Sequence, residues 1–383
     1  MKMKGTILVL TNNIRSICSF RREVMSAIVD AGYIVYISGM DNTDDDERIK
    51  SIEETGCKII KTYFDSRGKN PIADYLLLLE YRNIIKHLKP QAVLTYTIKP
   101  NVYGGIACRM TNTPLIANVT GLGDAIGNLG WLQKLVVALY KIGLGKANQV
   151  FFQNSANRKF CIDHKIADNH SVLIPGSGVN LNYHTYQEYP PDGVIKFLFV
   201  TRLLKSKGTS EFLEMAETLK EKYPHTEFQI LGWIVDNYQH KLEHLESKGI
   251  IKYLGITSDV RPFLKNVHAT ILPSYYHEGI SNVNLESAAN GRPVITTNIP
   301  GCRETVDDNI TGFIVNERSV DDLIAGVERF ILLPYNQKVL MGQNARKKVE
   351  QEFDRKIVVR AYLDCINHIK YPPKKNIKNI AVR

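Results

Sequence analysis

The chain alternates short apolar runs of strand length with longer stretches of helical periodicity, and this alternation constrains its fold more than any other feature. Repeated strand and helix units of this kind build a parallel sheet with helices on its faces. The runs form two successive series, near residues 7–10, 34–38, 92–96, 115–118, 149–152 and 172–174, and near 196–200, 227–231, 269–272, 293–297 and 313–315. The sequence therefore predicts an α/β protein with two doubly wound, Rossmann-like domains.

A polar, proline-bearing stretch, residues 186–193, separates the two series and is typical of a linker. We expect an N-terminal domain over 1–188 and a C-terminal domain over 189–354, followed by a helix and a basic tail over 355–383. A length of 383 residues suits two domains. Open parallel sheets bind ligands at the carboxyl ends of their strands, so we expect the ligand site in a central cleft that the two domains face.

The net charge of +10 is unevenly distributed along the chain. Residues 1–188 hold 22 Lys and Arg against 16 Asp and Glu, residues 189–354 hold 19 against 22, and residues 355–383 hold 8 against 1. Nucleic-acid binding needs a basic surface interleaved with stacking aromatic residues, or a reading helix, and the sequence has neither. We therefore expect no nucleic-acid partner, and the excess charge favours an anionic membrane surface or an acidic substrate.

The pattern of cysteines and acids predicts no metal site. The six cysteines are scattered, without metal-ligand spacing, as expected of reduced core residues in a cytoplasmic protein. Asp44, Asp45 and Asp46 contain an Asp-x-Asp sequence, but the surrounding acidic segment favours a solvated loop. The first apolar run is too short for a signal peptide and is predicted to be a buried strand.

The junction after residue 272 predicts a phosphate site. A strand ends there, a loop carries Glu278 and Gly279, and a helix begins near Ser281, whose hydroxyl suits an N-cap. The amides of Gly279, Ile280 and Ser281 would then face a phosphate at a helix N-terminus. Glu286, in the second turn of that helix, can accept hydrogen bonds from the vicinal hydroxyls of a ribose.

Two cations follow the first strand of the second series. Arg202 and Lys207 lie at its carboxyl end, on the edge where a ligand is expected. A guanidinium and an ammonium there can neutralise a diphosphate leaving group. The alternative for both residues is an ordinary solvated loop.

Taken together, these motifs resemble the retaining glycosyltransferases of family 4, which have the two-domain GT-B fold. The resemblance rests on Glu278 and Glu286 at their spacing, on Arg202 with Lys207, and on the glycine turn over residues 175–180. It implies that Glu286 binds the donor ribose, that Arg202 and Lys207 hold the donor diphosphate, and that Glu278 with the following amides contacts the transferred sugar and the phosphates. It also implies catalysis without metal or other cofactor, with retention of configuration, and a C-terminal helix that crosses back to the first domain.

Two N-terminal segments, residues 95–101 and 119–123, resemble a bacterial subgroup that extends glycans linked to undecaprenyl diphosphate for capsule, O-antigen or glycoprotein synthesis. The resemblance implies acceptor contacts for Lys99, Asn101, Gly121 and Gly123. A structural role for Lys99 and plain turns at the two glycines are equally compatible with the sequence. The sequence departs from the family at residues 11–15, where a Gly-Gly turn is usual, and at 231–234, where a glycine-acid-glycine loop is usual.

One amphipathic helix, predicted over residues 131–145, has two interpretations. Its apolar positions follow helical spacing, Lys134 and Lys141 share the opposite side, and it is too short and too charged to span a bilayer. It either packs on its own sheet or lies on a membrane surface, with Trp131 and Leu135 in the lipid and the two lysines at the headgroups.

The leading hypothesis is a glycosyltransferase at the inner face of the plasma membrane. It would move a sugar, an N-acetylated hexosamine or its 6-deoxy form by analogy with the subgroup, from a UDP-sugar to a lipid-linked glycan acceptor. Two alternatives remain from the sequence: a UDP-sugar epimerase or hydrolase of the same fold, and a basic membrane-binding protein without enzymatic activity.

Overall fold

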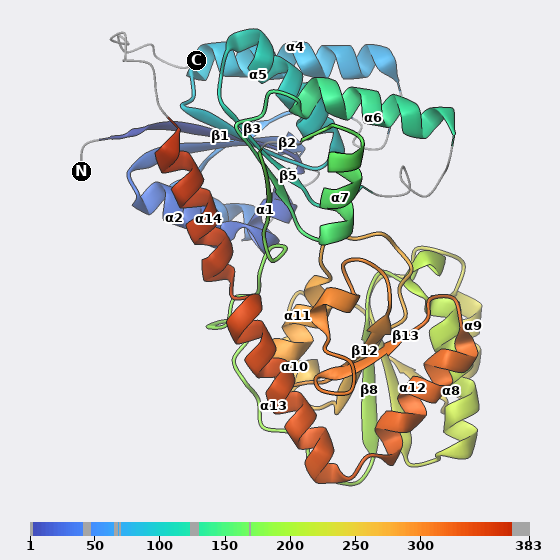
Figure 1. Cartoon of the computed structure of the whole chain (residues 1–383). Coiled ribbons are helices and arrows are strands. Elements are labelled where there is room, and N and C mark those ends of the chain that lie inside the picture. The colour runs from blue at the N-terminus through green and yellow to red at the C-terminus, as the bar shows by residue number, and fades with distance from the viewer. Residues whose placement is uncertain are drawn as a thin grey trace. The chain divides into compact units, whose positions relative to one another are not determined.

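The computed structural model describes residues 3–40, 47–64, 68, 70–122, 130–167 and 170–369. Over these residues the chain forms two parallel sheets of seven and six strands, with helices on both faces of each (Figure 1). This arrangement confirms the predicted α/β class with two doubly wound sheets.

The first sheet has the order β3-β2-β1-β4-β5-β6-β7. Its strands are β1 (Gly5–Asn13), β2 (Tyr33–Met40), β3 (Lys58–Lys61), β4 (Ala92–Tyr96), β5 (Leu115–Val119), β6 (Gln149–Phe152) and β7 (Ser171–Leu173). The accompanying helices are α1 (Ile14–Phe20), α2 (Arg22–Asp30), α3 (Glu47–Glu53), α4 (Pro71–Leu88), the π-helical turn η1 (Pro100–Gly104), α5 (Gly105–Thr111), α6 (Trp131–Leu144) and α7 (Ser155–Asp163). Asn13, in the segment that departs from the family, accepts the amide of Arg15 and caps α1.

The second sheet has the order β10-β9-β8-β11-β12-β13. Its strands are β8 (Ile195–Val200), β9 (Thr226–Leu231), β10 (Ile251–Tyr253), β11 (Ala269–Leu272), β12 (Val294–Thr297) and β13 (Gly312–Val315). The helical elements are η3 (Lys205–Lys207), α8 (Thr209–Lys222), α9 (Gln239–Ser247), α10 (Arg261–Leu264), α11 (Asn282–Ala289), η4 (Arg303–Thr305), α12 (Val320–Leu332), α13 (Tyr335–Glu352) and α14 (Arg355–His368).

Stacked aromatic side chains form the centre of the core under this second sheet. Phe197 on β8 stacks on Phe228 of β9, and Phe199 stacks on Phe212 of α8, with all four side chains fully buried. Burial of such rings is the largest favourable contribution that single side chains make to a core. The aromatic contacts therefore fix α8 on the face of the sheet, and with it the turn that precedes α8.

The described chain divides into two compact units, Met1–Ala117 with Ile142–Gln149 and Arg360–Arg383, and Asn118–Lys141 with Val150–Val359. The carboxyl ends of β5 and β6 thus belong to the second unit. In the first unit, Tyr362 of α14 is buried, and the centre of its ring lies 6.2 Å from the centre of the Tyr96 ring.

A buried arginine fixes the predicted linker. Arg292 is fully buried, and its guanidinium donates to the carbonyls of Gln187, Glu188 and Leu264 at 3.1, 2.8 and 2.8 Å. A buried guanidinium requires hydrogen-bond acceptors for its N–H groups, and carbonyls of the linker and of α10 supply them. Arg292 therefore holds the linker against α10.

Candidate active site

The predicted donor residues gather where the second sheet reverses its winding. β8 and β11 are neighbours in this sheet, but they are connected through β9 and β10 at one edge. A ligand binds at the carboxyl ends of the strands at such a point. Arg202 and Lys207 follow β8, Glu278 follows β11, and Glu286 lies on α11. The structure therefore places Arg202, Lys207 and Glu278 on the predicted ligand edge, and Glu286 on the helix that follows the same loop.

Lys207 is the central cation of the site. Its side chain is buried, forms an ion pair with Glu278, and lies 4.8 Å from the centre of the Tyr276 ring. Gly208 ends the turn η3 in the left-handed conformation, with φ of 76°, so that α8 can start immediately. The turn therefore directs the Lys207 ammonium toward the loop after β11.

Burial lowers the pKa of Lys207 to about 8, because the charged form loses its hydration. The thiol of Cys302 acts in the opposite sense, and the positive charge of the exposed Arg202 lowers the pKa further. The carboxylate of Glu278 favours the ammonium. An incoming diphosphate would supply the same kind of stabilisation to both cations.

The loop over Glu278–Ser281 agrees with the prediction in part. Ser281 is the N-cap of α11, and its hydroxyl accepts the amide of Asn284. The amide of Ser281, however, donates to the carbonyl of Gly301 at 2.8 Å and is not available to a ligand. Within the described residues, the amides of Gly279 and Ile280 have no acceptor in the chain, so these two groups remain candidate phosphate ligands.

Glu286 is partly buried on α11, and burial raises its pKa to about 7. The positive charge of Arg355 opposes this shift, and the negative charge of Asp259 adds to it. A carboxyl group that changes charge near neutrality suits a ligand-binding role and is uncommon on a solvated helix.

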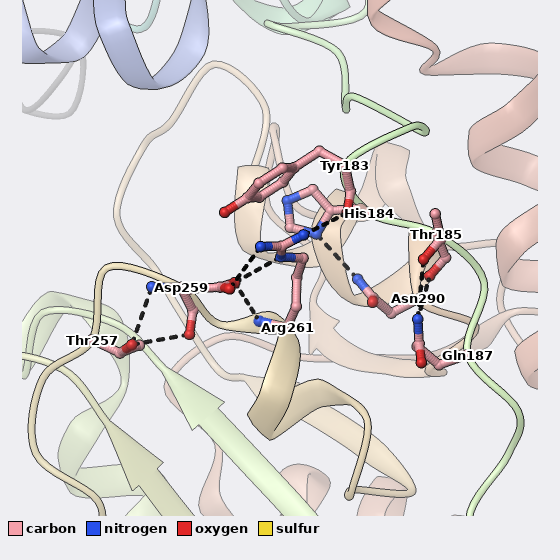
Figure 2. Close-up of polar contacts among 8 residues, drawn as sticks. All are labelled: Tyr183, His184, Thr185, Gln187, Thr257, Asp259, Arg261 and Asn290. Atoms are coloured by element: carbon pink, nitrogen blue, oxygen red, sulfur yellow. Dashed lines mark hydrogen bonds and ion pairs between the residues drawn. The ribbon is translucent and has the colours of Figure 1, made fainter. Parts of the chain in front are cut away.

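A polar cluster surrounds the end of α11 (Figure 2). Arg261 forms two hydrogen bonds of 2.8 Å with Asp259, and its guanidinium lies 3.6 Å from the centre of the Tyr183 ring. Asn290 donates to a ring nitrogen of His184 at 3.1 Å and to the carbonyl of Glu286 at 2.8 Å. The cluster therefore fixes the backbone that carries Glu286.

His184 is neutral in this cluster. Burial, assisted by the charges of Arg261 and Arg355, lowers its pKa to about 4. The sequence analysis missed this histidine, Arg355, Asp259, and also Asn154, which contacts the loop after β11. Residue type alone does not mark them as functional, because His184, Arg355 and Asn154 contact partners more than 100 positions away in the sequence. Asp259 pairs locally with Arg261, which is an ordinary surface pattern.

The predicted acceptor residues have different surroundings. Lys99 forms an ion pair of 2.6 Å with Asp74, which also accepts the hydroxyl of Tyr103 at 2.8 Å. The side chain of Asn101 is fully buried and accepts the hydroxyl of Thr95 at 2.7 Å, so it holds η1 in place and offers no surface to an acceptor.

Gly121 lies beside the donor loop. A Cβ atom at this position would be 3.4 Å from the amide nitrogen of Gly279. Gly123 and the Asp44–Asp46 segment lie outside the described residues. Within the described chain, no three His, Cys, Asp or Glu side chains form a group that could hold a metal ion.

The predicted amphipathic helix is α6. Tyr140 and Leu144 are buried, whereas Leu135 and Ile142 are 46% and 48% exposed and Lys134 and Lys141 are exposed. The helix thus has one packed side and one exposed apolar side, and the Trp131 side chain is not among those described. In the part of the chain that the structure describes, no helix combines the length and apolarity needed to cross a bilayer.

Two family models match the chain. The model of glycosyl transferases group 1 matches residues 187–348, and the model described as glycosyl transferase 4-like matches residues 7–154. Together they cover the second sheet and the first sheet apart from β7.

Curated relatives match over most of the length. A Campylobacter jejuni N,N'-diacetylbacillosaminyl-diphospho-undecaprenol alpha-1,3-N-acetylgalactosaminyltransferase is 27% identical, over 92% of this chain and 96% of the relative. An Escherichia coli UDP-Gal:alpha-D-GlcNAc-diphosphoundecaprenol alpha-1,3-galactosyltransferase is 25% identical, over 75% of this chain and 78% of the relative.

Solved structures share the fold. A glycosyltransferase from Rickettsia africae superposes with a TM-score of 0.79 at 20% identity, covering 96% of this chain and 99% of that structure. The Anabaena protein HepE, solved with UDP and glucose, superposes with a TM-score of 0.74 at 16% identity, covering 94% and 99%.

Proposed function

This chain belongs to the family 4 glycosyltransferases of GT-B fold, and on that premise we propose that it moves a sugar from a UDP-sugar to an acceptor linked to undecaprenyl diphosphate. The observation that carries the proposal is the meeting of Arg202, Lys207 and Glu278 at the winding reversal of the second sheet, next to α11. Two relatives are named for diphospho-undecaprenol acceptors, and one is named for transfer of N-acetylgalactosamine. The first name supports an N-acetylated hexosamine as the transferred sugar, whereas the second relative is named for transfer of galactose. The 6-deoxy form is proposed from the sequence resemblance alone.

In the proposed reaction, the bond between the anomeric carbon and the β-phosphate oxygen breaks, and the acceptor hydroxyl forms the new glycosidic bond. UDP leaves with an additional negative charge, which Lys207 and Arg202 would stabilise at the carboxyl end of β8. Glu278 would exchange its contact with Lys207 for the transferred sugar. We propose retention of configuration, with the leaving phosphate accepting the proton of the acceptor hydroxyl.

Glu286 would hold the nucleoside. Its carboxylate can accept hydrogen bonds from both ribose hydroxyls, and the polar cluster at the end of α11 fixes its backbone. A thermal-shift panel of UDP-sugars and GDP-sugars tests the donor class, because a ligand that binds only the folded state raises the melting temperature. We expect stabilisation by UDP-sugars; stabilisation by GDP-sugars alone would contradict the proposed donor.

We propose that two cations and two amides replace a divalent ion in this reaction. The prediction is that transfer measured in excess EDTA stays within about twofold of the untreated rate. A loss of more than about tenfold that Mg²⁺ or Mn²⁺ restores would show that a metal holds the diphosphate instead.

Product analysis with and without acceptor tests the reaction type. The proposal predicts labelled sugar in the lipid-extractable product when an undecaprenyl-diphosphate-linked sugar is supplied, and little consumption of donor without it. Conversion of the UDP-sugar at the same rate in both mixtures would identify an epimerase or a hydrolase.

We also propose peripheral association with the inner face of the plasma membrane, where such an acceptor resides. The exposed apolar side chains of α6 support it, together with Lys134 and Lys141 beside them. Each lysine near an anionic leaflet contributes about 1 kcal/mol. In this arrangement Lys99 and the backbone at Gly121 are the remaining candidates for acceptor contacts.

A further inference from the structure

We propose that Asn154 is a positioning residue for sugar transfer, because it aims the amides of Gly279 and Ile280 at the donor phosphates. The inference rests on the proposed function. Asn154 follows β6, is 1% exposed, and belongs with the donor loop to the second unit.

The Asn154 side chain has a fixed orientation. Its Oδ1 accepts the amide of Asn157 at 2.8 Å and caps α7. The cap requires oxygen on this side of the amide, so the nitrogen must face the other way. Nδ2 there donates to the carbonyl of Glu278 at 3.0 Å and to the carbonyl of Gly279 at 2.7 Å.

Fixing two carbonyls also fixes two N–H groups. In a planar trans peptide, the N–H points opposite to the C=O of the same unit. The carbonyl of Glu278 shares its peptide unit with the amide of Gly279, and the carbonyl of Gly279 shares its unit with the amide of Ile280. Asn154 therefore turns both N–H groups away from itself, and these are the two amides without an acceptor among the described residues.

The other contacts of the loop leave it little freedom. A Cβ atom on Gly279 would lie 2.1 Å from Oε1 of Gln153 and 2.4 Å from the carbonyl oxygen of Thr120. On another side, the carbonyl of Gly301 accepts the amide of Ser281 at 2.8 Å. Donors held in place before the reaction stabilise developing charge without reorganisation, so the loop is suited to a leaving diphosphate.

Asn154→Asp provides the sharpest test. Aspartate keeps the cap on α7 but places an oxygen against two carbonyl oxygens. We expect the Kd for UDP to rise at least tenfold and kcat/KM for the UDP-sugar to fall at least tenfold. The Kd for uridine, which has no phosphate, should stay within about twofold. Asn154→Ser, which caps but is too short to bridge, should change these values in the same direction.

Asn182→Asp is the control for the added negative charge, since Asn182 is exposed on the same unit. Parallel weakening of UDP and uridine by Asn154→Asp would indicate a merely structural role and overturn the proposal, as would a Kd for UDP within twofold of wild type. Wild-type protein that binds UDP but transfers no sugar would contradict the proposed function alone, whereas absence of UDP binding would overturn both.

Discussion

Two side chains of the site have pKa values that burial moves toward neutrality from opposite sides. Burial raises the pKa of Glu286 to about 7 and lowers the pKa of Lys207 to about 8. Between these values both groups carry their charges at a cost in hydration. A bound nucleoside diphosphate would stabilise both charged forms. Its ribose hydroxyls would donate hydrogen bonds to Glu286, and its anionic phosphates would pair with Lys207.

The affinity for UDP should depend on pH through Glu286. The ionised form of Glu286 accepts ribose hydrogen bonds, so UDP affinity should fall as pH drops below about 7, by up to about tenfold per unit. Lys207 stays protonated in this range. Measurement of the Kd for UDP with wild type and with Glu286→Gln at pH 7.5 and 5.5 checks this. Protonation of the UDP phosphate affects both proteins alike, so the difference between them reports on Glu286. Equal pH dependence in both proteins would contradict the role of Glu286.

The same residue predicts a change in stability. The folded-state pKa of Glu286 exceeds its ordinary value of 4.5, so the folded state gains stability as pH falls from above 7 toward 4.5. Glu286→Gln should therefore stabilise the fold at pH 8 by on the order of 1 kcal/mol, with the gain disappearing near pH 5. Denaturant titrations at both pH values measure it. Destabilisation at pH 8 would show that the carboxylate is favourably paired.

At the scale of elements, the site depends on the close packing of the turn after β8 against the chain that leaves β11. A Cβ atom on Gly208 would lie 2.2 Å from the carbonyl oxygen of Pro273, so the turn after β8 packs directly on the chain leaving β11. This close approach places Lys207 beside Glu278. Gly249 also has a positive φ, of 67°, but a Cβ atom there would meet no atom within 4 Å.

A matched pair of substitutions tests this close approach. Asparagine tolerates a positive φ, so Gly208→Asn and Gly249→Asn differ chiefly in the clash. We expect Gly208→Asn to lose about 2 kcal/mol or more of unfolding free energy and most of the transfer activity, whereas Gly249→Asn should cost less than about 1 kcal/mol. Equal effects of the two substitutions on stability and activity would contradict the packing argument.

The elements also show what the sequence can predict. The interior strands and the N-cap at Ser281 are confirmed, because burial and capping have local signatures. β3 and β10 were missed because lysines flank or interrupt their apolar runs: β3 has the sequence KIIK and β10 the sequence IKY. The bridge from Asn154 to Glu278 joins residues 124 positions apart, and local patterns carry no information about such a contact.

At the scale of the whole molecule, the charge separates along the chain. Residues 189–354, which carry the donor site, have more acids than bases, while the +10 of the chain comes from the segments before and after them. The proposed donor site therefore relies on a few individual cations, and not on a positive net charge of the region that carries it. The predicted domain boundaries, at 188 and 354, and the membrane contact stay predictions.

Liposome flotation tests the membrane contact of α6. We expect wild type to float with anionic vesicles, and Leu135→Asp to lose at least half of the bound fraction because an apolar contact is replaced by a charge. Leu332→Asp is the matched control, since Leu332 is 66% exposed on α12. Double substitution of Lys134 and Lys141 by Gln should reduce the preference for anionic over neutral vesicles. Equal flotation with neutral vesicles by wild type would contradict the electrostatic contribution.

The most direct test of the central claim is the rate of sugar transfer from a UDP-sugar to an undecaprenyl-diphosphate-linked acceptor by Lys207→Gln and Lys205→Gln. The two lysines flank Ser206 in η3, but Lys207 is buried against Glu278 whereas Lys205 is exposed. We predict that Lys207→Gln lowers kcat/KM by at least about 100-fold, in the range found for loss of one group that stabilises developing charge, while Lys205→Gln stays within about threefold. Transfer by Lys207→Gln at the wild-type rate, with the protein folded, would contradict the assignment of this site.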